Sequence, residues 1–275
     1  MVRIQDALFR LFLALVPLLG APAGRLTAAL VHLRRPRFLV RGFIDSYFVR
    51  RLGVDLDEAE KPAAAYPTIL DFFTRRLKKG ARPVDRAPGA LVSPADGVLA
   101  SFGRIDGGTV LQVKGMPYRV SELLEGSADA WEGGTWLTIY LSPKDYHRVH
   151  HPAEARLVGM RPIPGRLYPV NDRTVSRVPR VFSRNRRTIF EYRRGRTPIT
   201  LVMVTAFNVG RITPLFGAAS FPGLGLPVKR GGELAAFELG STVVLLLPKG
   251  AVRFSSLKAG LPLRMGRRLG VFTGK

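Results

Sequence analysis

Short apolar or alternating runs recur through most of the chain after residue 85. They have the length of β-strands and are bounded by Gly and Pro: 97–102, 110–113, 136–141, 155–160, 188–192, 199–204 and 243–247. No helical pattern alternates regularly with them, as a parallel doubly wound sheet would require. The pattern therefore predicts an α+β protein in which residues 86–275 form a mostly antiparallel β domain of barrel or sandwich type.

Residues 1–85 carry helical patterns instead. The expected stripes are Leu26, Leu30 and Leu33, then Phe43, Tyr47 and Phe48, then Leu70, Phe73 and Leu77. Arginines flank the first two stripes, which favours a membrane-facing hairpin over a helix pair packed on the core. Pro67 is expected at the first position of the third helix, which would run through Leu77.

The first 20 residues contain an apolar run, Leu11–Leu19, that Pro17 interrupts. It is too short to span a bilayer, which takes about 20 apolar residues. An interfacial helix fits the run, with Arg3 and Arg10 at the lipid head groups. A cleaved secretory signal fits it as well, because Ala21-Pro22-Ala23 resembles a cleavage site. The sequence leaves both open.

Charge narrows the possible partners. The chain has 43 Lys and Arg against 20 Asp and Glu, a net charge of +23, while 46% of its residues are hydrophobic. A folded protein with this bias is suited to a polyanion, either nucleic acid or an anionic membrane. Cysteine is absent, which excludes disulfides, cysteine–zinc sites and thiol catalysis.

Two motifs carry groups for acid–base chemistry. Asp96 lies in Ser-Pro-Ala-Asp-Gly at the entrance of a strand, where it either shapes a turn or orients an imidazole. His147, His150 and His151 lie together in residues 140–152. A zinc site would need a further ligand that the sequence does not supply, so we expect no metal and a general base or substrate-binding histidine instead.

The stretch 177–196 is strongly basic, and Phe182, Phe190 and Tyr192 are interleaved with its arginines. Such a run is usually a solvated face, but it could also bind a phosphodiester.

Gly240 and Ser241 directly precede the apolar run 243–247. The Gly-x-Ser-x-Gly pattern of a hydrolase does not surround Ser241. Gly240 offers an unhindered carbonyl that the Ser241 hydroxyl could attack. This N→O acyl shift would give an ester, and β-elimination would then cut the chain.

Several motifs occur in order and together resemble the phosphatidylserine decarboxylase family of the bacterial and mitochondrial type. They are FFTRRLKKGARPVD at 72–85, SPADG at 93–97, YLSPKDYHRVHHP at 140–152, PGRLYPVN at 164–171, VPRVFSRNRRTIF at 178–190 and ELGSTV at 238–243. The resemblance extends from about Phe43 to Leu247.

The resemblance implies a proenzyme that cleaves itself between Gly240 and Ser241. Residues 1–240 and 241–275 would form a heterodimer of the two fragments, and Ser241 would become a pyruvoyl cofactor. The pyruvoyl group would form a Schiff base with phosphatidylserine, which would lose CO₂ to give phosphatidylethanolamine. No metal is implied.

The resemblance also assigns roles to single residues. Asp96, His150 and Ser241 match the self-cleavage triad, in which His150 deprotonates Ser241 and Asp96 orients the imidazole. His147 matches the histidine of the decarboxylation step, where it would protonate the product carbanion, and Asp145 would support its loop. Because His151 directly follows His150, the assignment of the base among the histidines stays open.

The remaining expectations concern substrate and location. Arg184 and Arg187 are candidates for the head-group phosphate. The family implies a peripheral protein on the cytoplasmic side of the inner membrane, a homodimer of the processed unit and no nucleic-acid partner. The alternatives are a basic non-enzymatic protein that binds membrane or RNA, which the net charge suggests, and a secreted serine hydrolase, which the possible signal peptide suggests.

Overall fold

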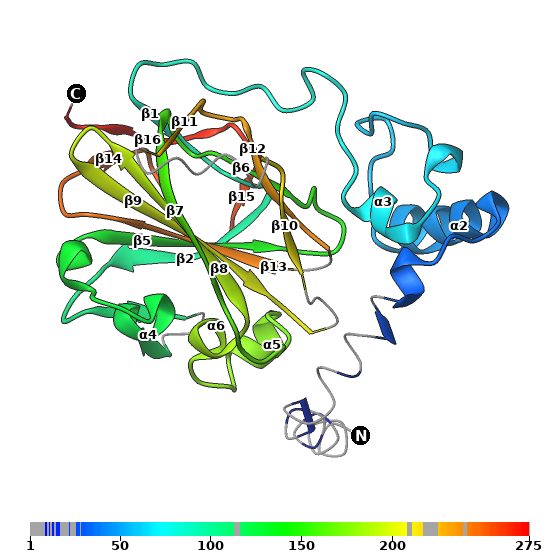
Figure 1. Ribbon diagram of the computed structural model, residues 1–275, viewed down its shortest axis with the longest axis horizontal. Helices are drawn as coiled ribbons and strands as arrows, with labels where there is room; N and C mark the ends of the chain where they lie inside the picture. The colour runs from blue at the N-terminus through cyan, green and yellow to red at the C-terminus, as the bar shows by residue number, and fades with distance from the viewer. Residues whose placement is uncertain are drawn as a thin grey trace.

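The computed structural model of the 275-residue chain describes residues 9, 11, 13, 15, 16, 22, 26, 27, 29–112, 116–207, 211–216, 225–238 and 241–274. Gly240 and most of residues 1–20 lie outside this set, so the interpretations that rest on them stay predictions. Figure 1 shows the strands gathered in one body, with helices α2 and α3 to one side of it.

The helical segments are short. They are α2 (Arg37–Phe43), the π-helix η1 (Ile44–Arg51), η2 (Ala63–Ala65), α3 (Ile69–Phe73), α4 (Val120–Leu124), η4 (Asp129–Trp131), α5 (Asp172–Val175) and α6 (Val181–Arg184). None of the helices in the described ranges is both long enough and apolar enough to cross a bilayer.

The strands begin at residue 90. They are β1 (Ala90–Val92), β2 (Gly97–Arg104), β3 (Thr109–Leu111), β4 (Pro117–Arg119), β5 (Thr135–Leu141), β6 (Arg148–His150), β7 (Ala155–Ile163), β8 (Arg187–Arg194), β9 (Thr197–Thr205), β10 (Ile212–Pro214), β11 (Leu226–Val228), β12 (Glu233–Phe237), β13 (Ser241–Leu247), β14 (Val252–Phe254), β15 (Leu261–Leu263) and β16 (Arg268–Phe272).

The largest sheet has the order β11-β7-β8-β9-β13-β5-β2-β15. Each neighbouring pair in it is antiparallel. Smaller sheets have the orders β10-β12-β6, β1-β16-β14 and β3-β4. The predicted α+β class with mostly antiparallel strands is therefore confirmed.

Strand β13 lies at the centre of the large sheet, between β9 and β5. Its side chains alternate between two apolar clusters, with Val243, Leu245 and Leu247 in one and Val244 and Leu246 in the other. This explains why the run is apolar at every position rather than at every second one. Burial of such a side chain stabilises the fold by about 1.5–3 kcal/mol, so the β13 segment is strongly held.

The helical part has an apolar cluster of its own, which includes Ile44, Phe48, Phe72 and Phe73. Aromatic rings make close contacts within it, with centroids of Phe48 and Phe72 5.0 Å apart. Phe73 of this cluster also contacts the His147 ring, with centroids 4.0 Å apart, so α3 lies next to the histidine motif.

The predicted helix from Pro67 through Leu77 is wrong at both ends. It begins after Thr68, whose hydroxyl accepts a hydrogen bond from the Asp71 N–H at 3.0 Å and caps the helix. It ends at Phe73, because Leu77 is extended and pairs with Ala59 in a β-bridge. Tertiary pairing therefore overrides the helical spacing in this segment.

Candidate active site

Ser241 is the first residue of β13 and pairs with Leu141 of β5 and Thr205 of β9. The residue is fully buried. Its hydroxyl oxygen has no hydrogen-bond partner among the described residues. A buried hydroxyl normally has a partner, so an unsatisfied one marks a position for chemistry or for a ligand.

The strands on either side of the histidine loop, residues 142–147, pair with the strands on either side of the predicted cleavage site. Leu141 pairs with Ser241 at one end. At the other end, the Phe237 N–H donates to the His147 carbonyl at 3.0 Å. The loop 142–147 therefore joins β5, which pairs with β13, to β6, which pairs with β12.

His147 is fully buried, and its ring contacts the Phe73 ring with centroids 4.0 Å apart. Its Nδ1 donates to the Asp145 carbonyl at 2.8 Å, so the neutral ring presents Nε2 as an acceptor. That Nε2 has no partner in the described part of the chain. Burial lowers the pKa of His147 to about 3, with a smaller contribution from the Arg75 charge. At neutral pH the imidazole is therefore uncharged.

Asp145 makes hydrogen bonds within the histidine loop. Its Oδ2 accepts hydrogen bonds from the N–H and the hydroxyl of Ser142, at 2.7 and 2.9 Å. Ser142 follows Leu141, the strand partner of Ser241. Burial raises the pKa of Asp145. Asp145 thus links Ser142, at the start of the loop, to His147, at its end.

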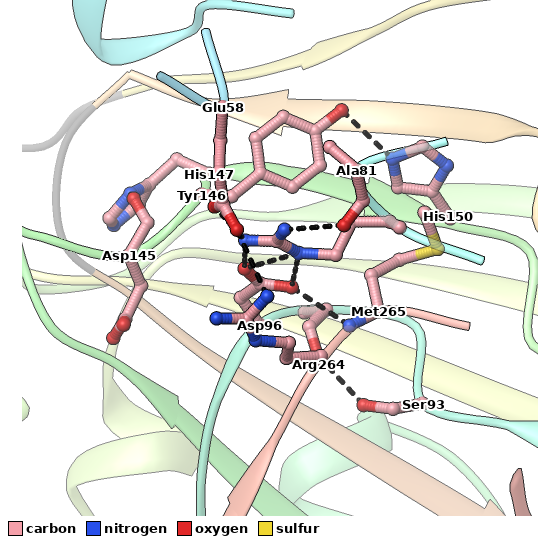
Figure 2. Close-up of polar contacts among 12 residues, drawn as sticks. Glu58, Ala81, Ser93, Asp96, Asp145, Tyr146, His147, His150, Arg264 and Met265 are labelled. Atoms are coloured by element: carbon pink, nitrogen blue, oxygen red, sulfur yellow. Dashed lines mark hydrogen bonds and ion pairs between the residues drawn. The ribbon is translucent and has the colours of Figure 1, made fainter. Parts of the chain in front are cut away.

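His150 is also buried, with both ring nitrogens occupied. Nδ1 donates to the Gly231 carbonyl at 2.9 Å, and Nε2 accepts from the Tyr146 hydroxyl at 3.1 Å. The ring centroids of Tyr146 and His150 are 5.6 Å apart, and Figure 2 shows the hydrogen bond between them. Burial lowers the pKa of His150, so this ring too is neutral near pH 7.

Asp96 lies beside His150, since the His150 N–H donates to the Pro94 carbonyl at 2.8 Å. Its carboxylate is nevertheless bound elsewhere: Arg82 donates to both oxygens, and the Met265 N–H donates to Oδ1 at 2.8 Å. The predicted hydrogen bond between Asp96 and His150 is not among the contacts of these two residues. Forming it would require one of the present contacts to be exchanged.

Arg82 is a residue of this site that the sequence patterns did not indicate. Its side chain is 7% exposed and joins Asp96 to Glu58, with 2.6 and 2.7 Å from Nη2 to the two carboxylates. The only signal for it was its place in the motif at 72–85. Asp96 lies 14 residues after Arg82 in the sequence, and the local spacing of residues does not indicate a pair so far apart.

His151 faces a different environment. Its Nδ1 is hydrogen-bonded with the Tyr192 hydroxyl at 3.1 Å, and Tyr192 belongs to the buried cluster under the large sheet. Burial lowers the pKa of His151 to about 4. The contacts of His151 are those of a core residue, whereas His147 keeps an acceptor nitrogen available for chemistry.

The two predicted phosphate ligands differ in the structure. All the N–H groups of Arg187 are taken up: it donates to the carbonyls of Leu123, Ser183, Asn185 and Glu122 and to the Glu125 carboxylate. As placed, Arg187 has no donor left for a phosphate, and the assignment needs correction. Arg184 is exposed, with its guanidinium over the Tyr168 ring, and its role stays a prediction.

The Ser241 environment fits a protein-derived carbonyl group. The residue is shielded from water, and its Oγ is unsatisfied in the described ranges. The unsatisfied Nε2 of His147 belongs to the loop that begins directly after Leu141, the strand partner of Ser241. Within the described ranges, no three His, Cys, Asp or Glu side chains are placed to share a metal ion.

Comparisons with known proteins agree on one family. The family model described as phosphatidylserine decarboxylase matches residues 69–271. A phosphatidylserine decarboxylase proenzyme of Halorhodospira halophila is 42% identical over 250 residues, covering 86% of each chain. Those of Hahella chejuensis and Acidovorax ebreus are 41% and 39% identical, covering 86% and 91% of this chain and 85% and 89% of their own. The chain therefore belongs to the phosphatidylserine decarboxylase family.

Proposed function

We propose that this decarboxylase converts phosphatidylserine to phosphatidylethanolamine with a pyruvoyl group that it makes from Ser241. The observation that carries the proposal is a pairing of strands: β13 and β12, on either side of the predicted cleavage site, pair with β5 and β6, on either side of the histidine loop. It brings the buried hydroxyl of Ser241 to the loop that holds Asp145 and His147. Family membership favours this function over the RNA-binding protein and the secreted serine hydrolase.

Self-cleavage would begin with attack of the Ser241 Oγ on the Gly240 carbonyl. The hydroxyl proton passes through a histidine, for which we propose His150, to the nitrogen of Ser241 as the C–N bond breaks and an ester forms. Loss of the Ser241 Cα proton then expels the Gly240 carboxylate. Hydrolysis of the resulting enamine releases ammonia and leaves the pyruvoyl group.

The pyruvoyl group supplies a ketone that can bind the substrate amine covalently and accept the electrons released with CO₂. The protein's own side chains must bind the substrate ammonium and supply the proton that Cα gains. We propose that Nε2 of His147, which has no partner in the described ranges, accepts a hydrogen bond from the substrate ammonium and relays one of its protons to the Cα carbon after CO₂ has left.

The apolar face of the helical part fits a membrane surface. Phe38, Leu39, Phe43 and Tyr47 are 72%, 51%, 41% and 42% exposed, and Arg41 lies among them. An exposed apolar face with cations beside it suits the boundary of an anionic bilayer. We propose peripheral binding on the cytoplasmic side of the inner membrane. The homodimer stays a prediction.

The test is intact-mass measurement of purified protein under denaturing conditions, paired with an assay of CO₂ release. We expect the fragments 1–240 and 241–275, with the second carrying pyruvoyl in place of serine. Ser241→Ala should remain one chain and release no CO₂. Ser255→Ala, an exposed serine on the same fragment, should cleave normally. An active preparation that contains only full-length chain with an intact Ser241 would contradict the proposal.

A further inference from the structure

A buried cation lies next to the candidate active site without a carboxylate partner. Arg75 is 5% exposed. In the described ranges its Nε has no hydrogen-bond partner, and its guanidinium makes only a long 3.5 Å contact from Nη1 to the Phe72 carbonyl. The Phe72 ring, 4.8 Å from the guanidinium carbon, compensates only part of the charge. Burying an unpaired cation costs free energy unless an anion forms an ion pair with it.

Arg75 lines a cavity of about 310 Å³. Two other arginines on its wall, Arg76 and Arg148, both contact Glu233. Of the two acids on the wall, Asp71 accepts a hydrogen bond from the Thr68 hydroxyl, and Glu60 is exposed. Four cations on the wall, Arg75, Arg76, Arg148 and Lys61, face these two acids and Glu233, so one net positive charge remains. Arg75 is the buried cation among them, and no carboxylate contacts it in the described ranges.

This cavity adjoins His147. The Phe73 ring that contacts His147 lies two residues before Arg75. Arg148 follows His147 and donates from Nε to the Thr74 carbonyl at 2.8 Å. The Arg75 charge also lowers the pKa of His147, which places the two groups within electrostatic range. A substrate whose amine reaches His147 would bring its neighbouring groups toward this cavity.

Phosphatidylserine carries two anions, a carboxylate and a phosphodiester. A guanidinium on the carboxylate would stabilise the charge that must disappear when CO₂ leaves, and so would slow the reaction. A guanidinium on the phosphodiester binds the ground state and the transition state equally. The phosphodiester is therefore the better ligand for Arg75.

We propose that Arg75 binds the phosphodiester of the lipid head group in this cavity, an inference that rests on the proposed function. Its planar fork can donate two parallel hydrogen bonds to a phosphate. Arg75 thus takes the role that the basic stretch at Arg184 and Arg187 was expected to have. Free inorganic phosphate has the same chemistry and should compete at the same place.

The test uses the self-cleaved enzyme with a short-chain phosphatidylserine that is monomeric in solution, so that membrane binding does not contribute. Arg75→Gln should raise KM roughly 10- to 100-fold with kcat changed much less, the loss expected for a hydrogen-bonded charge pair. Arg75→Lys should recover part of the loss. Arg253→Gln, an exposed arginine on β14, should leave KM unchanged.

Calorimetry gives a second readout without turnover. Glycerophosphoethanolamine, which has no carboxylate to lose, should bind the wild type and bind Arg75→Gln at least tenfold more weakly, and inorganic phosphate should compete with it. If Arg75→Gln does not fold, Arg75→Lys carries both measurements. An unchanged KM and unchanged binding in the folded variant would overturn the proposal, as would a fall in kcat alone. Failure of the proposed function itself would look different, because the wild type would then neither cleave nor release CO₂.

Discussion

Arg82 binds both carboxylate oxygens of Asp96 through its Nε, at 2.9 Å each, and also bonds to Glu58. Glu58 in turn contacts Arg264 at 2.9 Å. The carboxylate that the motif assigns to the self-cleavage triad is thus held by a residue of the helical part and by the backbone of Met265, beyond the predicted cleavage site. Its position depends on three separate segments of the chain.

Removing Arg82 should destabilise the protein and slow self-cleavage. Arg82→Met leaves Asp96 and Glu58 without their shared cation, and breaking a buried ion pair costs about 3–5 kcal/mol. The melting temperature and the rate of fragment appearance measure the two effects. Arg264→Gln is the matched control, because Arg264 is 68% exposed and its loss should cost under about 1 kcal/mol. Equal effects from the two substitutions would show that Arg82 has no special role.

Stability should fall as the pH falls below the ordinary histidine pKa of 6.5. Burial lowers the pKa of His147 to about 3 and that of His151 to about 4. Between these values and 6.5 the unfolded chain binds more protons than the folded one, so the stability present above pH 6.5 is lost on acidification. Each histidine contributes up to about 1.4 kcal/mol per pH unit.

The melting temperature at pH 7 and pH 5 tests this dependence. His151→Gln removes one titrating group that lies outside the proposed reaction. The variant should lose less stability between the two pH values than the wild type does. A wild type with the same melting temperature at both values would refute the assignment of neutral, buried histidines.

Gly97→Ala should prevent correct folding. Gly97 has φ +144°, and an added Cβ would lie 2.2 Å from the Tyr140 carbonyl oxygen, in the strand that pairs with Ser241. Backbone strain and the clash together should cost at least about 3 kcal/mol. Soluble yield and self-cleavage should both fall. Gly126→Ala, which has room for the methyl group, should preserve both, and a stable, self-cleaving Gly97→Ala protein would contradict the close approach of β2 to β5 at this position.

Polar substitutions on α2 should weaken membrane binding without destabilising the fold. Phe38→Ser removes a side chain that is 72% exposed, so the melting temperature should change little. Because the phenyl ring would no longer insert into the lipid, binding to vesicles of anionic phospholipid should fall roughly tenfold. Flotation of vesicles with bound protein measures this. Leu111→Ser, at an exposed position on β3, should bind as the wild type does, and equal binding of both variants would exclude α2 as the contact.

Hydrophobic patterning was sufficient to predict β3 and the six longer strands of the large sheet, because each of these is built from local alternation or from a short apolar run. It missed the other strands, which are only three to five residues long. Ser241 and the buried run after it were located this way, as was the antiparallel class. The pattern was misleading at Leu77, whose helical spacing is overridden by its pairing with Ala59. Spacing cannot indicate such a pairing, because the competing partner comes from another part of the chain.

The sequence by itself therefore determined the longer strands of the large sheet, the family and the residue types of the reaction. The tertiary structure decided which groups meet: Asp96 with Arg82 and Met265, Arg187 with five protein acceptors, and His147 with the Phe73 ring. It also revealed Arg75 as a buried cation with no carboxylate partner in the described ranges. The physical reason is that pairing and burial are properties of surfaces brought together by folding, and a residue's charge or motif does not specify what will cover it.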